Sequence, residues 1–312
     1  MIVWPAFAKV NLALEVLGRR PDGYHEIVSV MQTVDLHDTV AVAPAAALTF
    51  TCSDPALAGP DNLALRAAVA LRQSAAPGRG AAIDLDKRVP VAAGLGGGSS
   101  DAAATLLALD RLWELHLSAP RLNELAATLG ADVPFFLHGG TALVGGRGER
   151  IEPLPAAPER WLVLVRPPDS VPGKTALLYG RLTPADYGDG SATRAAAEAL
   201  RRGEFPADEV LVNTFARVAD GAFPGLAAAR ADLEAAAGRP AHLSGAGPTL
   251  FAVFTAPRPA EDALCRLQAK GREAYLVRTG PWRPQPCPVV NVDCEGTGGV
   301  TLSSPQYHFY DP

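Results

Sequence analysis

The sequence predicts an α+β fold with two domains, and three observations support that prediction. The chain has 312 residues, of which 48% are hydrophobic and 20% are charged, as in globular proteins long enough for one large domain or two ordinary ones. Segments with strand-type and helix-type patterns occur in both halves. Prolines and alanines cluster at residues 153–158. We therefore expect a first domain over residues 1–152, a second over 153–281, and a tail of unassigned role over 282–312.

The first half begins with strand-type patterns. Residues 2–18 contain short apolar runs typical of β-strands, and the turn-forming cluster GRRPDGYHE follows at residues 18–26. Residues 27–44 predict two strands that are broken at residues 37–38. The later segments predict, in order, a helix over 61–75 with Asp61 as its N-cap, a strand over 81–90, and helices over 99–115 and 118–130.

The second half alternates strands with helices, an order typical of a sheet with helices packed on it. The predicted strands are 162–166, 241–245, 249–254 and 273–278, and the predicted helices lie near 194–203, 208–219 and 259–271.

Charge and composition exclude several classes of protein. A formal net charge of -5 argues against a nucleic-acid-binding protein, which usually carries a basic surface. No uncharged apolar stretch is long enough to span a membrane, and the first residues lack the basic start of a signal peptide. The cysteines form no CxxC pair, so we expect a reduced, cytoplasmic protein without disulfides or a zinc site. The cysteines are Cys52, Cys265, Cys287 and Cys294.

The segment PVAAGLGGGSSDAAA at residues 90–104 contains an unusual glycine cluster. It follows a predicted strand and opens a predicted helix, where backbone N–H groups have no intrahelical partner and the helix dipole is positive. Glycines let such amides turn inward at positive φ, so the segment predicts a phosphate-binding loop. A flexible linker is the alternative, but a linker would not stand between a strand and a strong helix.

Two commoner nucleotide motifs do not fit the sequence. The G-x-G-x-x-G dinucleotide fingerprint needs a glycine where Ser99 stands. The tripeptide GKT at residues 173–175 resembles the end of a P-loop, but the leading glycine position holds Pro168, which has no N–H.

Lysines are scarce in this arginine-rich chain, so each one is a candidate for contact with a phosphate or a reacting hydroxyl, which a compact ammonium can make. The lysines are Lys9, Lys87, Lys174 and Lys270.

The pattern P-x-x-x-G-L-G-G-G-S-S resembles the phosphate-binding motif of the GHMP small-molecule kinases. Residues 6–27, 130–149 and 243–251 resemble other motifs of this family, in the family's order. Within the family, PDGYHE and GADVPFF point to the members that act on 4-diphosphocytidyl-2-C-methyl-D-erythritol. The resemblance covers roughly residues 5–255. It implies a GHMP kinase fold, with an N-terminal domain like ribosomal protein S5 and a ferredoxin-like C-terminal domain.

The resemblance implies that Lys9 and Asp132 are the catalytic pair. A carboxylate that is ionised at neutral pH can accept the proton of a reacting hydroxyl, and a lysine can hold both groups in place. By itself, an Asp before Val-Pro would be typical of a turn.

The resemblance also implies that ATP binds along the glycine loop, with Asn62, Leu63 and Lys87 in its adenine pocket. We expect Mg²⁺ to bind with ATP, chiefly through nucleotide oxygens and water, with Ser99 or Ser100 as candidate protein ligands. The loop residues predicted to bind ATP are Pro90, Val91, Ala92, Ala93, Gly94, Leu95, Gly96, Gly97, Gly98, Ser99 and Ser100.

For the second substrate, the resemblance implies that Tyr24 stacks on cytosine, that His25 contacts the cytosine edge, and that Tyr179 supplies a second ring. Asn11 corresponds to a polar contact with the methylerythritol part. The predicted substrate-binding residues are Asn11, Tyr24, His25, Thr175, Tyr179, Gly245 and Gly247.

The implied activity is ATP-dependent phosphorylation of the 2-hydroxyl of 4-diphosphocytidyl-2-C-methyl-D-erythritol, a step of the non-mevalonate isoprenoid pathway, by a monomer or a homodimer. Another GHMP kinase, of the homoserine or mevalonate type, and a catalytically inactive nucleotide-binding module are the alternatives. The presence of both Lys9 and Asp132 argues against an inactive module. Two positions depart from the family pattern. The family often has serine at the position of Ala246 and an aromatic residue at the position of Met31.

Overall fold

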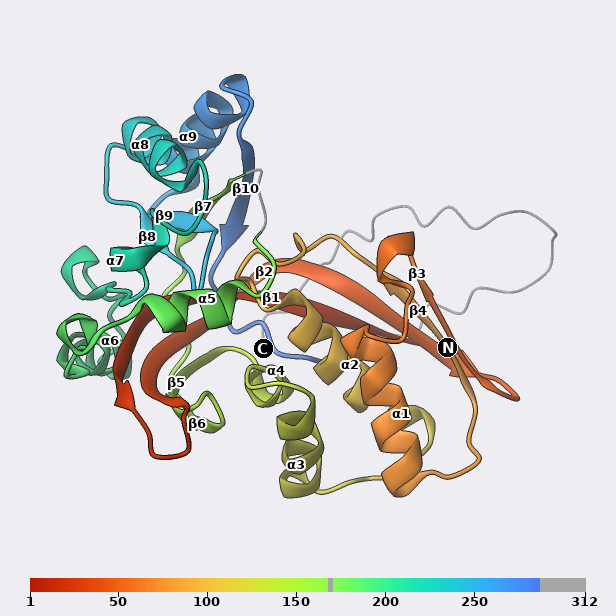
Figure 1. The fold of residues 1–312 in the computed structure, drawn as a ribbon. Coiled ribbons are helices and arrows are strands. Elements are labelled where there is room, and N and C mark those ends of the chain that lie inside the picture. The colour runs from red at the N-terminus through yellow and green to blue at the C-terminus, as the bar shows by residue number, and fades with distance from the viewer. Residues whose placement is uncertain (168–170, 287–312) are drawn as a thin grey trace.

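The computed structural model describes residues 1–167 and 171–286, and its strands form two sheets (Figure 1). The strands of the first sheet are β1 (Ile2–Arg19), β2 (His25–Pro44), β3 (Leu48–Cys52), β4 (Ala81–Asp86), β5 (Thr141–Gly146) and β6 (Arg150–Pro153). They lie in the order β3-β4-β2-β5-β6, with β1 paired to β2. The strands of the second sheet are β7 (Trp161–Arg166), β8 (His242–Leu243), β9 (Leu250–Phe254) and β10 (Glu273–Arg278). They lie in the order β10-β7-β9-β8, and all their pairings are antiparallel.

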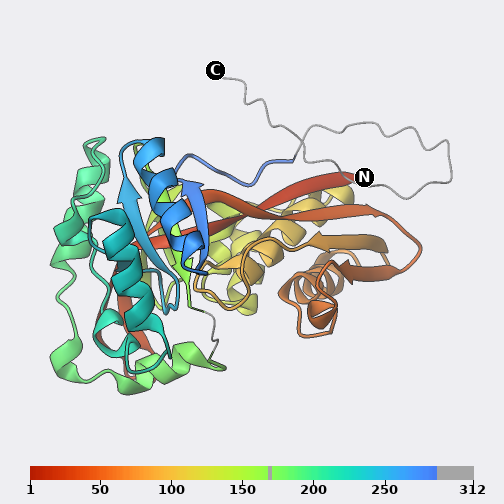
Figure 2. The same ribbon diagram turned by 90° about the horizontal axis from the view of Figure 1, so that it is seen from above.

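The antiparallel pair β1 and β2 runs from the second sheet to the far end of the first (Figure 2). Because β2 is continuous, the predicted break at residues 37–38 is wrong. The register instead shifts between Phe7 and Lys9, which produces a bulge in the pair. Asp38 is tolerated inside the strand because its carboxylate accepts the backbone N–H groups of residues 88 and 89 at 2.5 and 2.8 Å.

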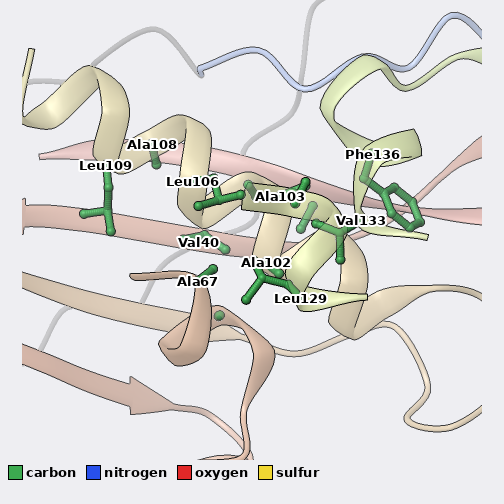
Figure 3. Close-up of a cluster of buried hydrophobic side chains, with 14 of the residues drawn as sticks. Val40, Ala67, Ala102, Ala103, Leu106, Ala108, Leu109, Leu129, Val133 and Phe136 are labelled. Carbon is green, nitrogen blue, oxygen red and sulfur yellow. The ribbon is translucent and has the colours of Figure 1, made fainter. Parts of the chain in front are cut away.

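The helices of the first half cover one face of the first sheet (Figure 1). They are α1 (Leu63–Ala75), α2 (Gly97–Leu112), α3 (Ala119–Leu129) and α4 (Val133–His138). Ala67 of α1 and Ala102 and Ala103 of α2 are fully buried in the same core as Val40 of β2 (Figure 3). Because alanine adds only a methyl group, the two helices can lie close to each other and to the sheet. This core fixes α2, and with it the end of the glycine loop.

Two helices begin at other residues than the sequence predicts. The N-cap of α1 is Asn62, whose side chain accepts the N–H of Ala64 at 2.9 Å, so the prediction of Asp61 is wrong. Helix α2 begins at Gly97 rather than at residue 99, because Gly96 adopts a left-handed conformation and starts the helix there.

The two faces of the second sheet pack against different parts of the chain. The helices of the second half are α5 (Lys174–Arg181), α6 (Ser191–Arg201), α7 (Ala216–Ala219), α8 (Leu226–Ala237) and α9 (Pro257–Ala269). Val163 and Val165 share a core with residues of α8 and α9. Leu162 and Leu164, which alternate with them and therefore face the opposite side, share a core with residues of α6, β1 and β2. The second of these cores joins the two sheets.

The predicted helix over residues 208–219 is wrong. A 3-10 turn at Asp208–Val210 and the short α7 are separated by backbone that runs beside β1. The N–H of Leu14 donates to the carbonyl of Val212 at 2.8 Å, and the N–H of Thr214 donates to the carbonyl of Leu14 at 2.9 Å. These bonds satisfy groups that would otherwise be paired within a helix. Helices α4, α5 and α8 are absent from the sequence prediction.

After β10 the chain returns to the first sheet. The hydroxyl of Thr33 donates to the carbonyl of Trp282 at 2.8 Å, and the Trp282 ring stacks on Phe7 with centroids 5.9 Å apart. The start of the tail predicted over residues 282–312 therefore packs on the body of the protein, while its part from residue 287 onward lies outside the described residues. The domain limits remain a prediction.

In the described part of the chain, no helix is long and apolar enough to cross a membrane. Cys52 and Cys265 are free within that part, whereas Cys287 and Cys294 lie outside the described residues.

Candidate active site

A cavity of about 1080 Å³ lies where the first sheet, the glycine loop and the second half of the chain meet. Its walls come from β1, the turn after it, the loop before α2, the start of α4, helix α5 and the turn after β8. Pockets for one small molecule measure about 300–1,000 Å³, so this cavity is at the upper limit of that range. Every residue predicted for catalysis, ATP binding or substrate binding lines it, except Leu95, Ser100 and Gly247.

These three residues lie behind the cavity wall. The carbonyl of Leu95 accepts the backbone N–H of Lys9 at 2.9 Å, which ties the glycine loop to β1. Ser100 is 3% exposed in the first turn of α2, so of the two serines predicted as Mg²⁺ ligands only Ser99 lines the cavity. Gly247 is buried in the turn after β8.

The glycine loop needs glycine at two positions. Gly94 and Gly96 have φ values of +86° and +73°, which side chains rarely adopt. A Cβ on Gly96 would lie 2.5 Å from the ring of Phe136, and one on Gly94 would lie 2.7 Å from the carbonyl oxygen of Gly247. The expectation of positive φ holds for these two glycines, whereas residues 97–98 are already helical.

The start of α2 is open to an anion. The first N–H groups of a helix have no acceptor within the helix, and the dipole places partial positive charge there. Because the N-cap is Gly96, no side chain in the described part of the chain caps these groups. A phosphate can therefore approach the backbone directly.

Lys9 and Asp132 lie together in the cavity. The Lys9 side chain is 4% exposed and that of Asp132 is 32% exposed, and Lys9 Nζ lies 3.4 Å from Asp132 Oδ2. Asp132 is the N-cap residue of α4, yet its side chain makes no capping hydrogen bond within the described residues. The carboxylate is therefore not used by the helix and faces a lysine, as a general base held by a cation would.

Asn11 holds the lysine from the other side. Its Oδ1 accepts from Lys9 Nζ at 2.5 Å, and its Nδ2 donates to Ser29 Oγ at 2.7 Å. The turn after β8 closes against this group, because a Cβ on Gly245 would lie 2.9 Å from Asn11 Oδ1 and 3.3 Å from Lys9 Nζ. The Ser244 hydroxyl accepts the backbone N–H of Asn11 at 3.3 Å. The same hydroxyl donates to the carbonyl of Gly94, also at 3.3 Å. The side chain of Asn11 thus positions Lys9, and its predicted contact with substrate stays a prediction.

Lys87 also lies beside the glycine loop, between two buried carboxylates. Its ammonium donates to Asp38 Oδ2 at 2.5 Å and to Asp101 Oδ2 at 2.7 Å. Burial lowers the pKa of Lys87, but the charges of Asp101 and Asp38 outweigh burial and leave that pKa raised. Burial and the charge of Asp38 raise the pKa of Asp101 well above its usual range. Asp101 Oδ1 has no hydrogen-bond partner among the described residues.

Aromatic side chains form the end of the cavity farthest along β1. The His25 ring stacks on Tyr179, with centroids 4.6 Å apart. Tyr24 is 57% exposed, and the guanidinium of Arg147 lies 4.6 Å from the centre of its ring. Burial and the charge of Arg19 lower the pKa of His25, so the imidazole is neutral near pH 7. Burial, with the nearby Asp132, raises the pKa of Tyr179 to about 12. A base sandwiched by Tyr24 and Tyr179 stays a prediction.

Sequence reasoning missed several residues of this site. The hydroxyl of Ser244 and the carboxylates of Asp38 and Asp101 act only through tertiary contacts, so no local pattern marks them. Arg147 lies within residues 130–149, which resemble a family motif, so the sequence could have marked it as a candidate. The scarcity of lysine marked Lys174, which lines the cavity but received no role.

Two family models match the chain. The N-terminal domain of the GHMP kinases matches residues 62–140, and the C-terminal GHMP kinase model matches residues 196–273. The Cytophaga hutchinsonii homoserine kinase structure has a TM-score of 0.70 at 17% identity, over 92% of this chain and 97% of the other, and supports the fold alone.

Three proteins with about 40% identity to this chain are named as the same enzyme. The 4-diphosphocytidyl-2-C-methyl-D-erythritol kinase of Dehalococcoides mccartyi is 40% identical over 90% of this chain and 99% of its own length. The Symbiobacterium thermophilum protein of that name is 44% identical over 87% of this chain and 97% of its own. A crystal structure of 4-(cytidine 5'-diphospho)-2C-methyl-D-erythritol kinase matches with a TM-score of 0.76 at 40% identity, over 89% of this chain and 99% of the other. The chain has the two-domain GHMP kinase fold and belongs to the 4-diphosphocytidyl-2-C-methyl-D-erythritol kinase family of the GHMP kinases.

Proposed function

We propose that this protein transfers the γ-phosphoryl group of ATP to the 2-hydroxyl of 4-diphosphocytidyl-2-C-methyl-D-erythritol. The observation that carries the proposal is the placement of the Lys9–Asp132 pair, 3.4 Å apart, in one cavity with the glycine loop and the aromatic cluster. The glycine loop offers backbone amides to the phosphates of ATP, and the cluster offers rings to a base. The pair supplies the base and the cation that activate a hydroxyl.

In the proposed reaction, Asp132 accepts the proton of the 2-hydroxyl. The hydroxyl oxygen forms a bond to the γ-phosphorus, and the bond from this phosphorus to the β,γ-bridging oxygen breaks to release ADP. Phosphoryl transfer depends chiefly on positioning and charge stabilisation. Lys9 supplies a fixed positive charge beside Asp132, and Asn11 with Ser29 holds Lys9 in place.

A hydroxyl residue of the cavity wall, Ser99, suits a magnesium ion that would be held mainly by oxygens of the nucleotide. Among the described residues, no group of three or more His, Cys, Asp or Glu side chains is placed to hold a metal. The Ser99 hydroxyl lines the cavity and is the protein ligand that we propose. When bound, Mg²⁺ neutralises charge on the phosphate oxygens.

A substrate panel tests the proposal. ADP release would be followed with the CDP-linked substrate, its UDP-linked analogue, homoserine and mevalonate. We expect turnover with the CDP-linked compound and strong rejection of the UDP analogue, whose altered base edge would leave a polar group of the site unpaired. Phosphorus NMR of the product would locate the new phosphate on the 2-hydroxyl.

Three outcomes would contradict the proposal. Equal rates for the CDP- and UDP-linked compounds would show that the cavity has no pocket specific for cytidine. Turnover of homoserine or mevalonate would favour the activity of the other GHMP kinases. ADP release with none of the four would favour an inactive nucleotide-binding module. The monomeric or homodimeric state and the cytoplasmic location stay predictions.

A further inference from the structure

Lys174 is a cationic side chain of the cavity wall that the proposed mechanism does not use. It is the first residue of α5, it is half-buried, and it lines the cavity together with Lys9 and Asp132. Its ammonium donates to the carbonyl oxygen of Gly247, and within the described part of the chain it forms no ion pair with a carboxylate. Lys174 thus donates to a neutral carbonyl, whereas Lys9 and Lys87 pair with carboxylates.

The charges around Lys174 disfavour an additional cation. Burial, together with the like charges of Lys9 on β1 and Arg166 on β7, outweighs the attraction of Asp132 before α4 and lowers the pKa of Lys174 to about 8. The positive end of the α5 dipole adds to this repulsion. An anion in the cavity would relieve the repulsion that the free protein contains.

The position of the ammonium indicates where that anion lies. The Gly247 carbonyl that binds Lys174 is also the group that a Cβ on Gly94 would meet at 2.7 Å, so Lys174 lies beside the phosphate loop. Tyr179 is five residues further along α5, or about 7.5 Å at the rise of an α-helix. Lys174 therefore stands between the phosphate loop and the aromatic end of the cavity.

We propose that Lys174 is a ligand-binding residue that pairs with a phosphate group in this cavity, either the diphosphate of a CDP-linked substrate or the terminal phosphate of ATP. The inference rests on the proposed function for the identity of the two ligands, but not for the existence of the anion site. It gives a half-buried lysine of the cavity wall, which lies near the like charges of Lys9 and Arg166, an anion to pair with.

Equilibrium binding to the full-length protein tests the proposal without relying on turnover. Isothermal titration would use CDP against cytidine, and a non-hydrolysable ATP analogue against adenosine. The variants are Lys174→Met, which removes the charge, and Lys174→Arg, which keeps it. Lys270→Met is the matched control, because Lys270 is an exposed lysine that pairs with Asp232 on α8.

We expect Lys174→Met to weaken binding of one phosphorylated probe about tenfold or more, the size of one charge-assisted contact, and to leave the nucleosides unchanged. Weaker CDP binding would assign the contact to the substrate diphosphate, and weaker binding of the ATP analogue would assign it to the terminal phosphate. Lys174→Arg should retain part of the affinity, and Lys270→Met should retain all of it. Unchanged affinity of Lys174→Met for both phosphorylated probes would overturn the inference.

Thermal unfolding without ligand separates ligand binding from a structural role. The pKa of Lys174 is about 8 in the folded protein and near 10.5 when unfolded, so its charge destabilises the fold fully below pH 8. This cost disappears as pH rises from 8 through 10.5. Lys174→Met should therefore keep or raise the Tm at pH 7. A lowered Tm with unchanged anion binding would show that the lysine only supports the Gly247 carbonyl, and would overturn the proposal.

The pH dependence of binding gives a further readout. Wild-type affinity for the phosphorylated probe should fall as pH rises above 8, and Lys174→Met should lose this dependence. Lys9, Arg166 and Asp132, which also face the ammonium, are present in both proteins, so the difference isolates Lys174. Failure of the wild type to phosphorylate the CDP-linked compound would contradict the proposed substrate, whereas these binding measurements decide the role of Lys174.

Discussion

Lys9 and Lys87 both lie beside the glycine loop, and the two lysines are paired differently. Lys87 lies between Asp38 and Asp101, whose side chains are 0% and 3% exposed. Lys9 pairs with Asp132, whose side chain is 32% exposed and lines the cavity. Both groups reach the cavity wall, but the carboxylates that hold Lys87 are almost inaccessible, whereas the Asp132 carboxylate is partly exposed to a ligand.

This difference separates structural support from chemistry. Asp38 accepts two backbone N–H groups just before the glycine loop, so the Lys87 group fixes where the loop begins. A buried ion pair gains little net stability, but it is costly to break because the remaining charge is left unpaired. Asp132 makes no capping hydrogen bond within the described residues, and it is the group that we propose as the base for the hydroxyl proton. We therefore expect mutations in the Lys87 group to change stability and mutations at Asp132 to change turnover.

The largest expected effect is on turnover, at Asp132. Asp132→Asn should lower kcat by about 10²- to 10⁴-fold, because the amide cannot accept the proton, while the fold and ATP binding are kept. Steady-state kinetics and thermal unfolding would measure the two effects. Glu149→Gln is the matched control, because this carboxylate also lines the cavity but does not contact Lys9. Near-normal turnover of Asp132→Asn would contradict the assignment of Asp132 as the base and would leave it only a structural role in the turn before α4.

In the Lys87 group, Asp38→Ala should lower the free energy of unfolding by about 3–5 kcal/mol, because Lys87 and two backbone N–H groups lose their acceptor. Denaturant unfolding would measure it. Asp101→Asn should cost clearly less, since its Oδ1 has no partner in the described part of the chain and an amide oxygen can still accept from Lys87. Equal losses in the two variants would contradict the division between them.

Two glycines at the start of α2 provide a smaller, matched pair of changes. Gly96→Ala should cost roughly 1–3 kcal/mol of stability and raise the KM for ATP, because φ is +73° and the Cβ would meet the Phe136 ring at 2.5 Å. Gly98→Ala should be neutral or stabilise by up to about 1 kcal/mol, because it is helical and its Cβ would lie 3.6 Å from Leu63. Unfolding curves and ATP kinetics of both variants decide this. A tolerated alanine at residue 96 would remove the argument for close packing at the loop.

Local features were predictable from the sequence, and long-range partners were not. The glycine loop was predictable because the strand before it and the helix after it adjoin it in the chain. Lys9 and Asp132 required the family resemblance, because only tertiary folding brings them together. The partners of Lys87 come from β2 and α2, so no spacing of residues indicates them.

Helix α8 shows a different limit of sequence reasoning. Its buried residues, Leu226, Ala229, Leu233 and Ala236, have helical spacing. The alanines on its exposed side are apolar as well, which hides the pattern. The predicted helix over residues 208–219 was wrong for another reason. There the local pattern indicated a helix, but β1 forms hydrogen bonds with the backbone in the middle of this segment.

The smallest expected effect lies at the aromatic end, where Tyr24 is exposed and Arg147 lies over its ring. Stacking on a base contributes about 1–3 kcal/mol, so Tyr24→Ala and Tyr179→Ala should each raise the KM for the CDP-linked substrate about 5- to 150-fold. An exposed cation–π contact contributes only about 0.5–1 kcal/mol, so Arg147→Met should change that KM by no more than about fivefold. Its direction is informative: a lower KM means that the guanidinium occupies the ring face that the base needs, and a higher KM means that it contacts the substrate. If Tyr24→Ala has no larger effect than Arg147→Met, the exposed tyrosine does not stack on the base, and recognition of cytidine rests on His25 and Tyr179.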